Sequence, residues 1–328
     1  MNAATGLGLA AATGLAFVNG ANDISKSIAT LVGSGESSYR RAVVLTALAT
    51  AAGAVLASAW AVKLTLLFTH GMLSPQVQLN ELFAMAVLAG AIGWVALASR
   101  FGWPVSTTHA IVGSVVLTGA YAFGFDSVLW SSLTRKVAVP LLLSPLVAYG
   151  VSILFFRGLN WICRERYCLN CHWSHWMSAM TSGFARGLND TPKIAALGLA
   201  FYGLADAAAS VALRWFFLAL AAAMAAGAIT MGFKTTETLA VEVIAMDHLE
   251  GFAANLSTTL LVVFGATQGW PMSTTHVAGG GIMGIGARRG GKALRWKTVA
   301  EIAFAWALTV PAAGLLGVAS YWLLRRCG

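Results

Sequence analysis

The chain contains the stretch Gly102-Trp103-Pro104-Val105-Ser106-Thr107-Thr108-His109 and repeats it, with one substitution, as Gly269-Trp270-Pro271-Met272-Ser273-Thr274-Thr275-His276. The two copies are 167 positions apart, and a second shared motif around Asp23 and Asp190 has the same separation. Two motifs that share one separation indicate a duplicated unit rather than a chance match.

Both copies of the stretch lie inside long apolar tracts. A Gly-Trp-Pro break followed by Ser-Thr-Thr predicts the start of a helix, with the proline in the first turn and a hydroxyl capping the free N–H groups. At membrane depth such a helix start favours an anion, because unpaired donors and the positive end of the helix dipole converge there.

The composition predicts an integral membrane protein. Of the 328 residues 58% are hydrophobic and 10% charged, and the mean hydropathy is +0.75, which would leave a soluble domain with large exposed apolar surface. The length accommodates about ten membrane crossings. Residues 1–21 lack the basic region of a signal peptide and are predicted to remain as the first span.

The net charge is +9, but several basic residues lie at the ends of apolar tracts. This placement indicates membrane topology and contact with anionic lipid rather than nucleic-acid binding. The residues concerned are Arg40, Arg41, Arg164, Arg166, Arg288, Arg289, Arg325 and Arg326.

Five apolar tracts occur in each half of the chain. The third and fourth tracts of each half are joined only by Phe101-Gly102-Trp103 or by Gln268-Gly269-Trp270, which is too short for an aqueous loop between two full spans. We therefore predict a re-entrant helical hairpin in each half. The tracts are 3–21, 42–68, 82–100, 104–123 and 137–157, then 180–203, 210–233, 252–268, 271–289 and 299–324.

An odd number of crossings per half places the second copy upside down relative to the first, which is the plan of many secondary transporters. The predicted fold is an all-α polytopic membrane protein with two inverted-topology repeats, 1–157 and 179–328, and an inter-repeat loop at 158–178.

Basic loops set the predicted orientation. Residues 287–297 and the inter-repeat loop are rich in Arg and Lys, so both are expected on the cytoplasmic side and both termini outside. The pairs Arg135-Lys136 and Arg325-Arg326 then fall on the outer face, contrary to the rule that basic residues gather on the cytoplasmic side.

Duplicated charged residues lie within the apolar tracts. Asn22, Asp23 and Lys26 correspond to Asn189, Asp190 and Lys193. A central Asp or Lys costs about 2.5–3.5 kcal/mol on insertion scales, so these four charged groups would cost about 10 kcal/mol if unpaired. They either form neutralising pairs three residues apart on a helix face or line a functional site, and the duplicated Ser-Thr-Thr favours the site.

The motifs together resemble the inorganic phosphate transporter (PiT) family. The resemblance rests on Gly20-Ala21-Asn22-Asp23, the Trp-Pro-Val-Ser-Thr-Thr-His-Ala stretch, Glu237-Thr238-Leu239, and Gly251-Phe252-Ala253-Ala254. It implies a multi-span, dimeric inner-membrane symporter that moves phosphate together with Na+ or H+. Sulfate permease-like members of the family leave sulfate, with proton coupling, as the alternative.

The resemblance also implies roles for individual residues. Asp23 and Asp190 would hold the coupling cations, with Glu237 assisting. The anion would be surrounded by hydroxyl and amide groups, with the two lysines as further candidates. These substrate-binding candidates are Asn22, Lys26, Ser106, Thr107, Thr108, Asn189, Lys193, Ser273, Thr274 and Thr275.

Lys26 departs from the family pattern, which usually reads Asn-Asp-Val-Ala-Asn where this chain has Asn22-Asp23-Ile24-Ser25-Lys26. The ammonium would either occupy a Na+ position as a tethered cation or contact the anion directly. We therefore expect transport to depend less on Na+ than in relatives.

Two other functional classes were compared with the carrier. His109 and His276 complete a Ser-x-x-His spacing that a hydrolase could use, but an enzyme seldom keeps two copies of a catalytic pair at inverted positions. We expect no enzymatic activity and no cofactor. An ion channel fits less well, because paired carboxylates and facing hairpins favour a closed central site over an open pore.

The inter-repeat loop contains Cys163, Cys168 and Cys171, followed by His172 and His175. The C-x-x-C spacing with His175 is compatible with a small zinc or redox site. Reduced cysteines are the favoured interpretation, because the outer ligands are close together for a zinc module and the loop is expected in the cytoplasm.

Overall fold

The computed structural model describes residues 3–77, 80–164, 171–199, 211–290 and 293–327. Helices dominate this part of the chain, and its β structure is a single isolated bridge between Leu73 and Val128. Six of the described helices are long and apolar enough to cross a membrane. The prediction of an all-α polytopic membrane protein is confirmed.

The elements of the first repeat run in chain order from the N-terminus. They are α1 (Ala3–Asp23), α2 (Ser25–Gly33), α3 (Tyr39–Trp60), α4 (Val62–His70), α5 (Glu81–Arg100), α6 (Thr107–Phe123), η1 (Phe125–Ser127), α7 (Trp130–Ser132), η2 (Leu133–Ala138) and α8 (Val139–Arg164).

The second repeat contains α9 (Cys171–Leu199), α10 (Val211–Met231), α11 (Phe233–Glu237), η3 (Thr238–Glu242), α12 (His248–Gln268), α13 (Thr274–Arg288) and α14 (Trp296–Cys327). The connection between repeats is therefore shorter than the expected 158–178, because α8 continues through the first part of that range and α9 already forms its end.

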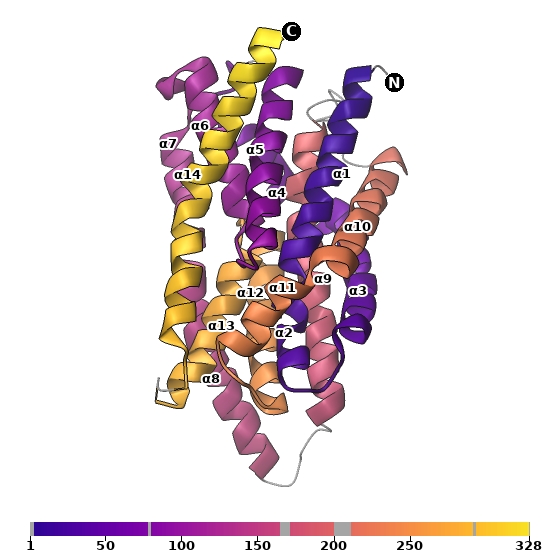
Figure 1. Cartoon of the computed structure of the whole chain (residues 1–328), viewed down its shortest axis with the longest axis vertical. Helices are drawn as coiled ribbons and strands as arrows, with labels where there is room; N and C mark the ends of the chain where they lie inside the picture. The colour runs from indigo at the N-terminus through magenta and orange to yellow at the C-terminus, as the bar shows by residue number, and fades with distance from the viewer. Residues whose placement is uncertain (1–2, 78–79, 165–170, 200–210, 291–292, 328) are drawn as a thin grey trace.

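The two hairpins enter the molecule from opposite ends. In Figure 1, α5 and α6 descend from the end at which both termini lie, whereas α12 and α13 occupy the other half. The tips of the two hairpins meet near the middle of the long axis. This arrangement is the inverted repeat that the sequence predicts.

The repeats exchange helices. The helix α1 packs on α10, and its repeat counterpart α9 packs on α3. A Cβ at Gly20 would lie 1.9 Å from the Met224 carbonyl oxygen, and one at Gly187 would lie 2.1 Å from that of Thr50. The glycine of each Gly-x-Asn-Asp motif therefore allows backbone-to-backbone contact, which brings the following Asn-Asp to the centre of the molecule.

Each hairpin turns at a glycine with left-handed backbone, Gly102 (φ 74°) and Gly269 (φ 78°). An extended segment follows, and Ser106 and Ser273 then cap α6 and α13 by accepting the backbone N–H three residues later, at 3.2 Å in both copies. The predicted serine caps are present. The prolines, however, precede the caps within the extended segment and are not in the first helical turn.

Candidate functional site

The two hairpin tips contact each other through reciprocal hydrogen bonds. The Thr275 hydroxyl donates to the Val105 carbonyl oxygen at 2.7 Å, and the Thr108 hydroxyl lies 3.5 Å from the Met272 carbonyl oxygen. These carbonyls are available because the segment before each cap is extended and makes no helical hydrogen bond there. The predicted Ser-Thr-Thr segments therefore form one site from both repeats.

The Lys26 ammonium lies in a shell of oxygen atoms. It donates to the carbonyl oxygen of Asn22 at 2.9 Å, to the Asn22 side-chain oxygen at 2.8 Å and to Asp23 Oδ1 at 2.6 Å. The Val105 carbonyl oxygen lies 3.4 Å away. Backbone carbonyls and a carboxylate are also the groups that coordinate alkali cations in broken-helix transporters.

Lys193 has the equivalent position in the second repeat. Its ammonium donates to the Met272 carbonyl oxygen at 2.9 Å and to Asp190 Oδ1 at 3.4 Å. It also donates to the Thr108 hydroxyl of the first repeat at 2.7 Å. The lysine therefore joins the two hairpin tips, in addition to pairing with its own carboxylate.

Asn19 links the two carboxylates. Its amide nitrogen lies 3.2 Å from Asp23 Oδ2, 3.4 Å from Asp190 Oδ2 and 3.1 Å from the Thr107 hydroxyl. Asp23 Oδ2 also accepts from the Thr274 hydroxyl of the opposite hairpin at 3.2 Å. Asp23 therefore contacts a predicted hydroxyl group directly, and Asp190 is linked to the Thr107 hydroxyl through Asn19.

The predicted asparagines mainly hold the extended segments in place. Asn22 accepts from the Val105 backbone N–H at 3.0 Å and donates to the Trp103 carbonyl oxygen at 2.9 Å. Asn189 donates to the Met272 carbonyl oxygen at 3.0 Å. In this structure the asparagines position the carbonyls and caps of the site.

Arg186 is a site residue that sequence reasoning missed. It is 1% exposed, and its Nη2 donates to the Thr50 hydroxyl at 3.3 Å, whereas its Nε and Nη1 are buried without a partner. Arg186 occupies the repeat position of Asn19, next to the Gly-x-Asn-Asp motif. Because the two residues differ, a search for identical pairs overlooks both of them.

The site is closed to solvent and carries an excess of positive side chains. The buried site contains three basic side chains, Lys26, Arg186 and Lys193, and two acidic ones, Asp23 and Asp190. Two helix N-termini add positive potential. Every predicted substrate residue and both aspartates are at most 4% exposed. A buried excess of one positive charge is suited to binding an anion.

Glu237 lies away from this cluster. It is the last residue of α11 and is exposed, unlike the buried aspartates. None of the described hydrogen bonds or ion pairs joins it to Asp23 or Asp190. The structure therefore does not bring this predicted cation ligand into the site.

The predicted zinc ligands are only partly described. Cys168 lies outside the described residues, as do the side chains of Cys163 and Cys171. His175 is fully buried, and its Nε2 lies 3.0 Å from the Thr30 hydroxyl. In this structure, His175 hydrogen-bonds within the protein core.

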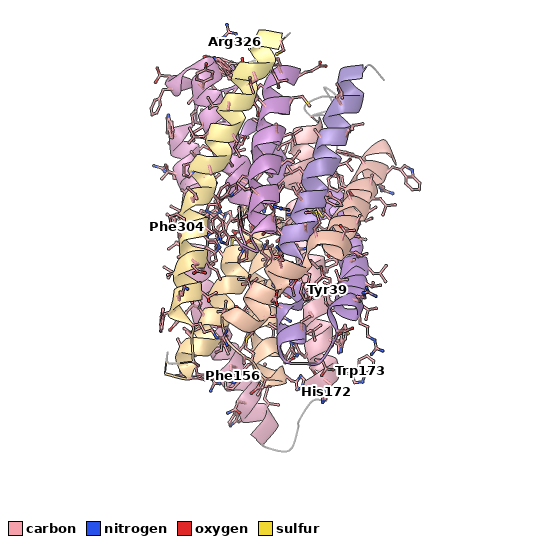
Figure 2. All side chains as sticks on the ribbon, in the orientation of Figure 1. Tyr39, Phe156, His172, Trp173, Phe304 and Arg326 are labelled. Carbon is pink, nitrogen blue, oxygen red and sulfur yellow. The ribbon has the colours of Figure 1, made fainter. Side chains whose placement is uncertain are left out.

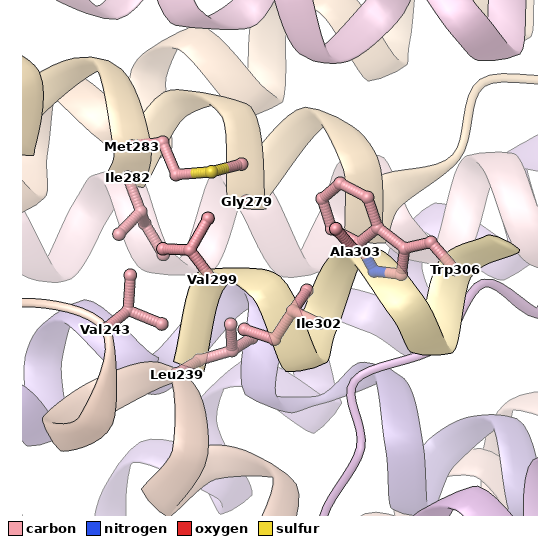
Figure 3. Close-up of a pocket in the computed structure, with 9 residues that line it drawn as sticks. All are labelled: Leu239, Val243, Gly279, Ile282, Met283, Val299, Ile302, Ala303 and Trp306. Carbon is pink, nitrogen blue, oxygen red and sulfur yellow. The ribbon is translucent and has the colours of Figure 1, made fainter. Parts of the chain in front are cut away.

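Two cavities next to the hairpins differ from the charged centre. One of about 520 Å³ is lined by mostly apolar side chains together with His109 and His276, whose ring centroids are 4.4 Å apart. His276 Nδ1 lies 2.6 Å from its own cap, Ser273 Oγ. The other cavity, of about 40 Å³, is lined by apolar side chains and Trp306 (Figure 3). Neither lining contains a site carboxylate or lysine.

Two inverted hairpins that meet at a buried charged centre define a membrane transporter. The model of the phosphate transporter family matches residues 19–176 and, a second time, 164–317. The chain belongs to this family, and it is a transporter and not an enzyme.

Similar proteins include a "Probable low-affinity inorganic phosphate transporter" of Mycobacterium bovis, 32% identical over 319 residues that cover 95% of this chain and 75% of that protein. A Bacillus subtilis protein of the same description is 27% identical, with 94% and 93% covered. A solved structure titled "The sodium-dependent phosphate transporter" superposes with a TM-score of 0.88 at 20% identity, covering 99% of this chain and all of that one. This likeness supports the fold.

Proposed function

We propose that the chain is a cation-coupled symporter that takes up inorganic phosphate by alternating access around the hairpin tips. The observation that carries the proposal is the set of hydrogen bonds between the tips, above all Lys193 to Thr108 and Thr275 to Val105. They are made by two inverted copies of one motif, so an equivalent closure is available toward either face of the membrane.

The anion is held by Arg186 together with the capped ends of α6 and α13. The free Nε and Nη1 of Arg186 are a fork of donors that suits a tetrahedral oxyanion, and the Thr107, Thr108, Thr274 and Thr275 hydroxyls add donors from both hairpins. Protonated phosphate also needs an acceptor for its O–H, which Asp23 or Asp190 supplies. Sulfate has no such proton and is the second candidate.

Coupling in this chain depends on Na+ less than in relatives, because the Lys26 ammonium already occupies an oxygen shell. The two aspartates carry the coupling cation, and with Na+ displaced by Lys26 a proton is the favoured partner. The cation offsets the charge of the anion, so that the loaded site crosses the low-dielectric region at a smaller electrostatic cost.

The experiment is uptake of labelled phosphate into proteoliposomes that contain the purified chain. Uptake should saturate, should resist an excess of sulfate, and should continue when Na+ is replaced by choline at fixed pH. Suppression by sulfate would favour the sulfate carrier, collapse in choline would reject the reduced Na+ dependence, and unsaturable current would indicate a channel.

The proposal includes placement in the cell inner membrane as a homodimer. Both termini lie at one end of the molecule, and the end of α8 and the start of α9 lie at the other end (Figure 1). The basic residues around 287–297 and at the end of α8 favour a cytoplasmic position for that other end. Cysteine labelling of the two ends in intact cells and in inverted vesicles tests the orientation.

A further inference from the structure

A cluster of imidazole and carboxylate groups lies outside the central site. Glu36 in the turn between α2 and α3, His172 in the first turn of α9 and His248 at the start of α12 bring their ligand atoms within 4.8 Å of one another. Figure 2 places His172 at the end of the molecule opposite Arg326, and therefore opposite the C-terminus.

The spacing of the ligand atoms suits a metal ion. His172 Nδ1 lies 2.6 Å and His248 Nδ1 3.4 Å from the same oxygen, Glu36 Oε2. His248 Nδ1 is buried and makes no hydrogen bond. A tetrahedral ion with bonds of about 2 Å spaces its ligand atoms by roughly 3.3 Å, so small side-chain shifts would accommodate it.

The surroundings of Glu36 fix its orientation. The Trp176 indole N–H donates to Oε1 at 3.2 Å, which leaves Oε2 facing the two imidazoles. The side chain of Glu36 is 12% exposed and that of His172 64%. A hydrogen-bonded, largely buried carboxylate next to an accessible imidazole provides both an oriented ligand and a route from solvent.

We propose that Glu36, His172 and His248 form a binding site for a divalent transition-metal ion of the zinc type. Two imidazole nitrogens and one carboxylate oxygen, with water as the fourth ligand, suit Zn²⁺ and disfavour Mg²⁺, which prefers oxygen ligands. This site differs from the Cys-rich set that the sequence suggests, and it uses no cysteine.

The site joins three elements that belong to different parts of the carrier. Glu36 follows α2, the short helix that contains Lys26. His248 begins the hairpin helix α12 and His172 lies in the first turn of α9, and these helices pack on one another. Opening of this end of the carrier would separate them. Bound metal therefore holds the end closed and slows transport, a consequence that rests on the proposed function.

Metal binding is tested by calorimetry on the full-length protein in detergent, stripped with a chelator and titrated with ZnCl₂. We expect one Zn²⁺ per chain, with affinity lowered at least tenfold in Glu36→Gln, His172→Ala and His248→Ala. The control variants are Glu301→Gln, an exposed carboxylate on α14, and a triple Cys163→Ser, Cys168→Ser, Cys171→Ser chain. Both should bind as the parent does.

Absence of Zn²⁺ binding, undiminished binding in His248→Ala, or loss of binding in the triple cysteine variant would overturn the assignment. The consequence for transport is measured separately in proteoliposomes with micromolar Zn²⁺ inside and outside. Inhibition should be reversed by a chelator and should be absent in His248→Ala. If the parent binds Zn²⁺ but its phosphate uptake is unchanged, the inference that bound metal slows transport is wrong. If no phosphate uptake occurs at all, the proposed function fails, while calorimetry still decides the metal site.

Discussion

The Thr275 hydroxyl donates a 2.7 Å hydrogen bond to the carbonyl oxygen of Val105, a residue 170 positions earlier in the chain and on the opposite hairpin. The bond is buried and joins the two repeats at the point where each helix is interrupted. Its repeat counterpart, Thr108, lies next to the Met272 carbonyl oxygen and also receives the Lys193 ammonium. In both repeats, the second threonine of the helix thus contacts the opposite hairpin tip. Thr108 also accepts a hydrogen bond from the Lys193 ammonium.

Removal of either hydroxyl should weaken anion binding. Thr275→Val or Thr108→Val keeps the shape of the side chain but deletes a donor that contributes about 0.5–1.5 kcal/mol, so we expect the KM for phosphate to rise roughly two- to tenfold. Initial uptake rates over a range of phosphate concentrations measure this. Thr230→Val is the matched control, because the Thr230 hydroxyl is exposed and bonds only within its own helix. Equal KM values in all four proteins would remove the threonines from the site.

Neutralising the carboxylates should abolish coupled uptake. Asp23→Asn and Asp190→Asn keep the size of the side chain and its capacity to hydrogen-bond. They leave Lys26 or Lys193 without its buried counter-charge and remove the ligand for a proton or cation. We expect accumulation of labelled phosphate to fall to background, while size-exclusion profiles in detergent stay unchanged. Glu301→Gln provides the control at an exposed position. Normal accumulation in both aspartate variants would place coupling elsewhere.

Arg186 should contribute strongly to anion affinity. A hydrogen bond to a charged donor is worth about 1.5–3 kcal/mol, so Arg186→Gln should raise the KM for phosphate roughly 10- to 100-fold. Arg186→Lys keeps the charge but loses the fork of donors, so its KM for phosphate should lie between those of the parent and of Arg186→Gln. Thermal unfolding of each variant in detergent separates lost binding from lost folding. A stable Arg186→Gln protein with unchanged KM would contradict the assignment.

Lys26→Asn should make uptake respond to Na+. The substitution removes the tethered ammonium from its shell of oxygens and introduces the amide of the expected Asn-Asp-Val-Ala-Asn pattern, so that a free cation is needed there. Uptake of labelled phosphate is compared in Na+ and choline at fixed pH, with Lys297→Asn at an exposed position as the control. We expect a several-fold stimulation by Na+ in Lys26→Asn alone. Equal rates in the two media would show that the ammonium does not replace Na+.

The motif glycines should stabilise the fold. Ala at Gly187 would place its Cβ 2.1 Å from the Thr50 carbonyl oxygen, and forcing apart two packed backbones costs about 1–3 kcal/mol or more. We expect Gly187→Ala to lower the Tm in detergent. Gly158→Ala on α8, where a Cβ would have no neighbour within 4 Å, should leave the Tm unchanged or slightly raised. Identical Tm values would contradict the close approach.

The duplicated polar motifs predicted the fold well, because their spacing and the short Gly-Trp connection constrain the topology directly. The serine caps follow from the same residues. The proline position differed, because Pro104 and Pro271 serve the extended segment that exposes the carbonyls, and a sequence pattern cannot distinguish this from a first helical turn.

Within the site, the paired residues were predictable and the unpaired ones were not. Asp23, Asp190 and the threonines occur twice in register, whereas Asn19 and Arg186 share a repeat position but not a residue type. The functional asymmetry of the site is therefore invisible to a search for identity. Glu237 was predicted from a motif match, but its own side chain is exposed at the end of the short helix α11.

The exchanged packing of α1 with α10 and of α9 with α3 has an evolutionary consequence. A half-length ancestor could cover the glycine face of its first helix only against a second polypeptide lying antiparallel to it in the bilayer. Such a precursor would have been inserted in both directions and would have worked as an antiparallel pair. Fusion of two such genes would fix the orientation of each half and would allow the shared repeat position to carry Asn19 in one half and Arg186 in the other.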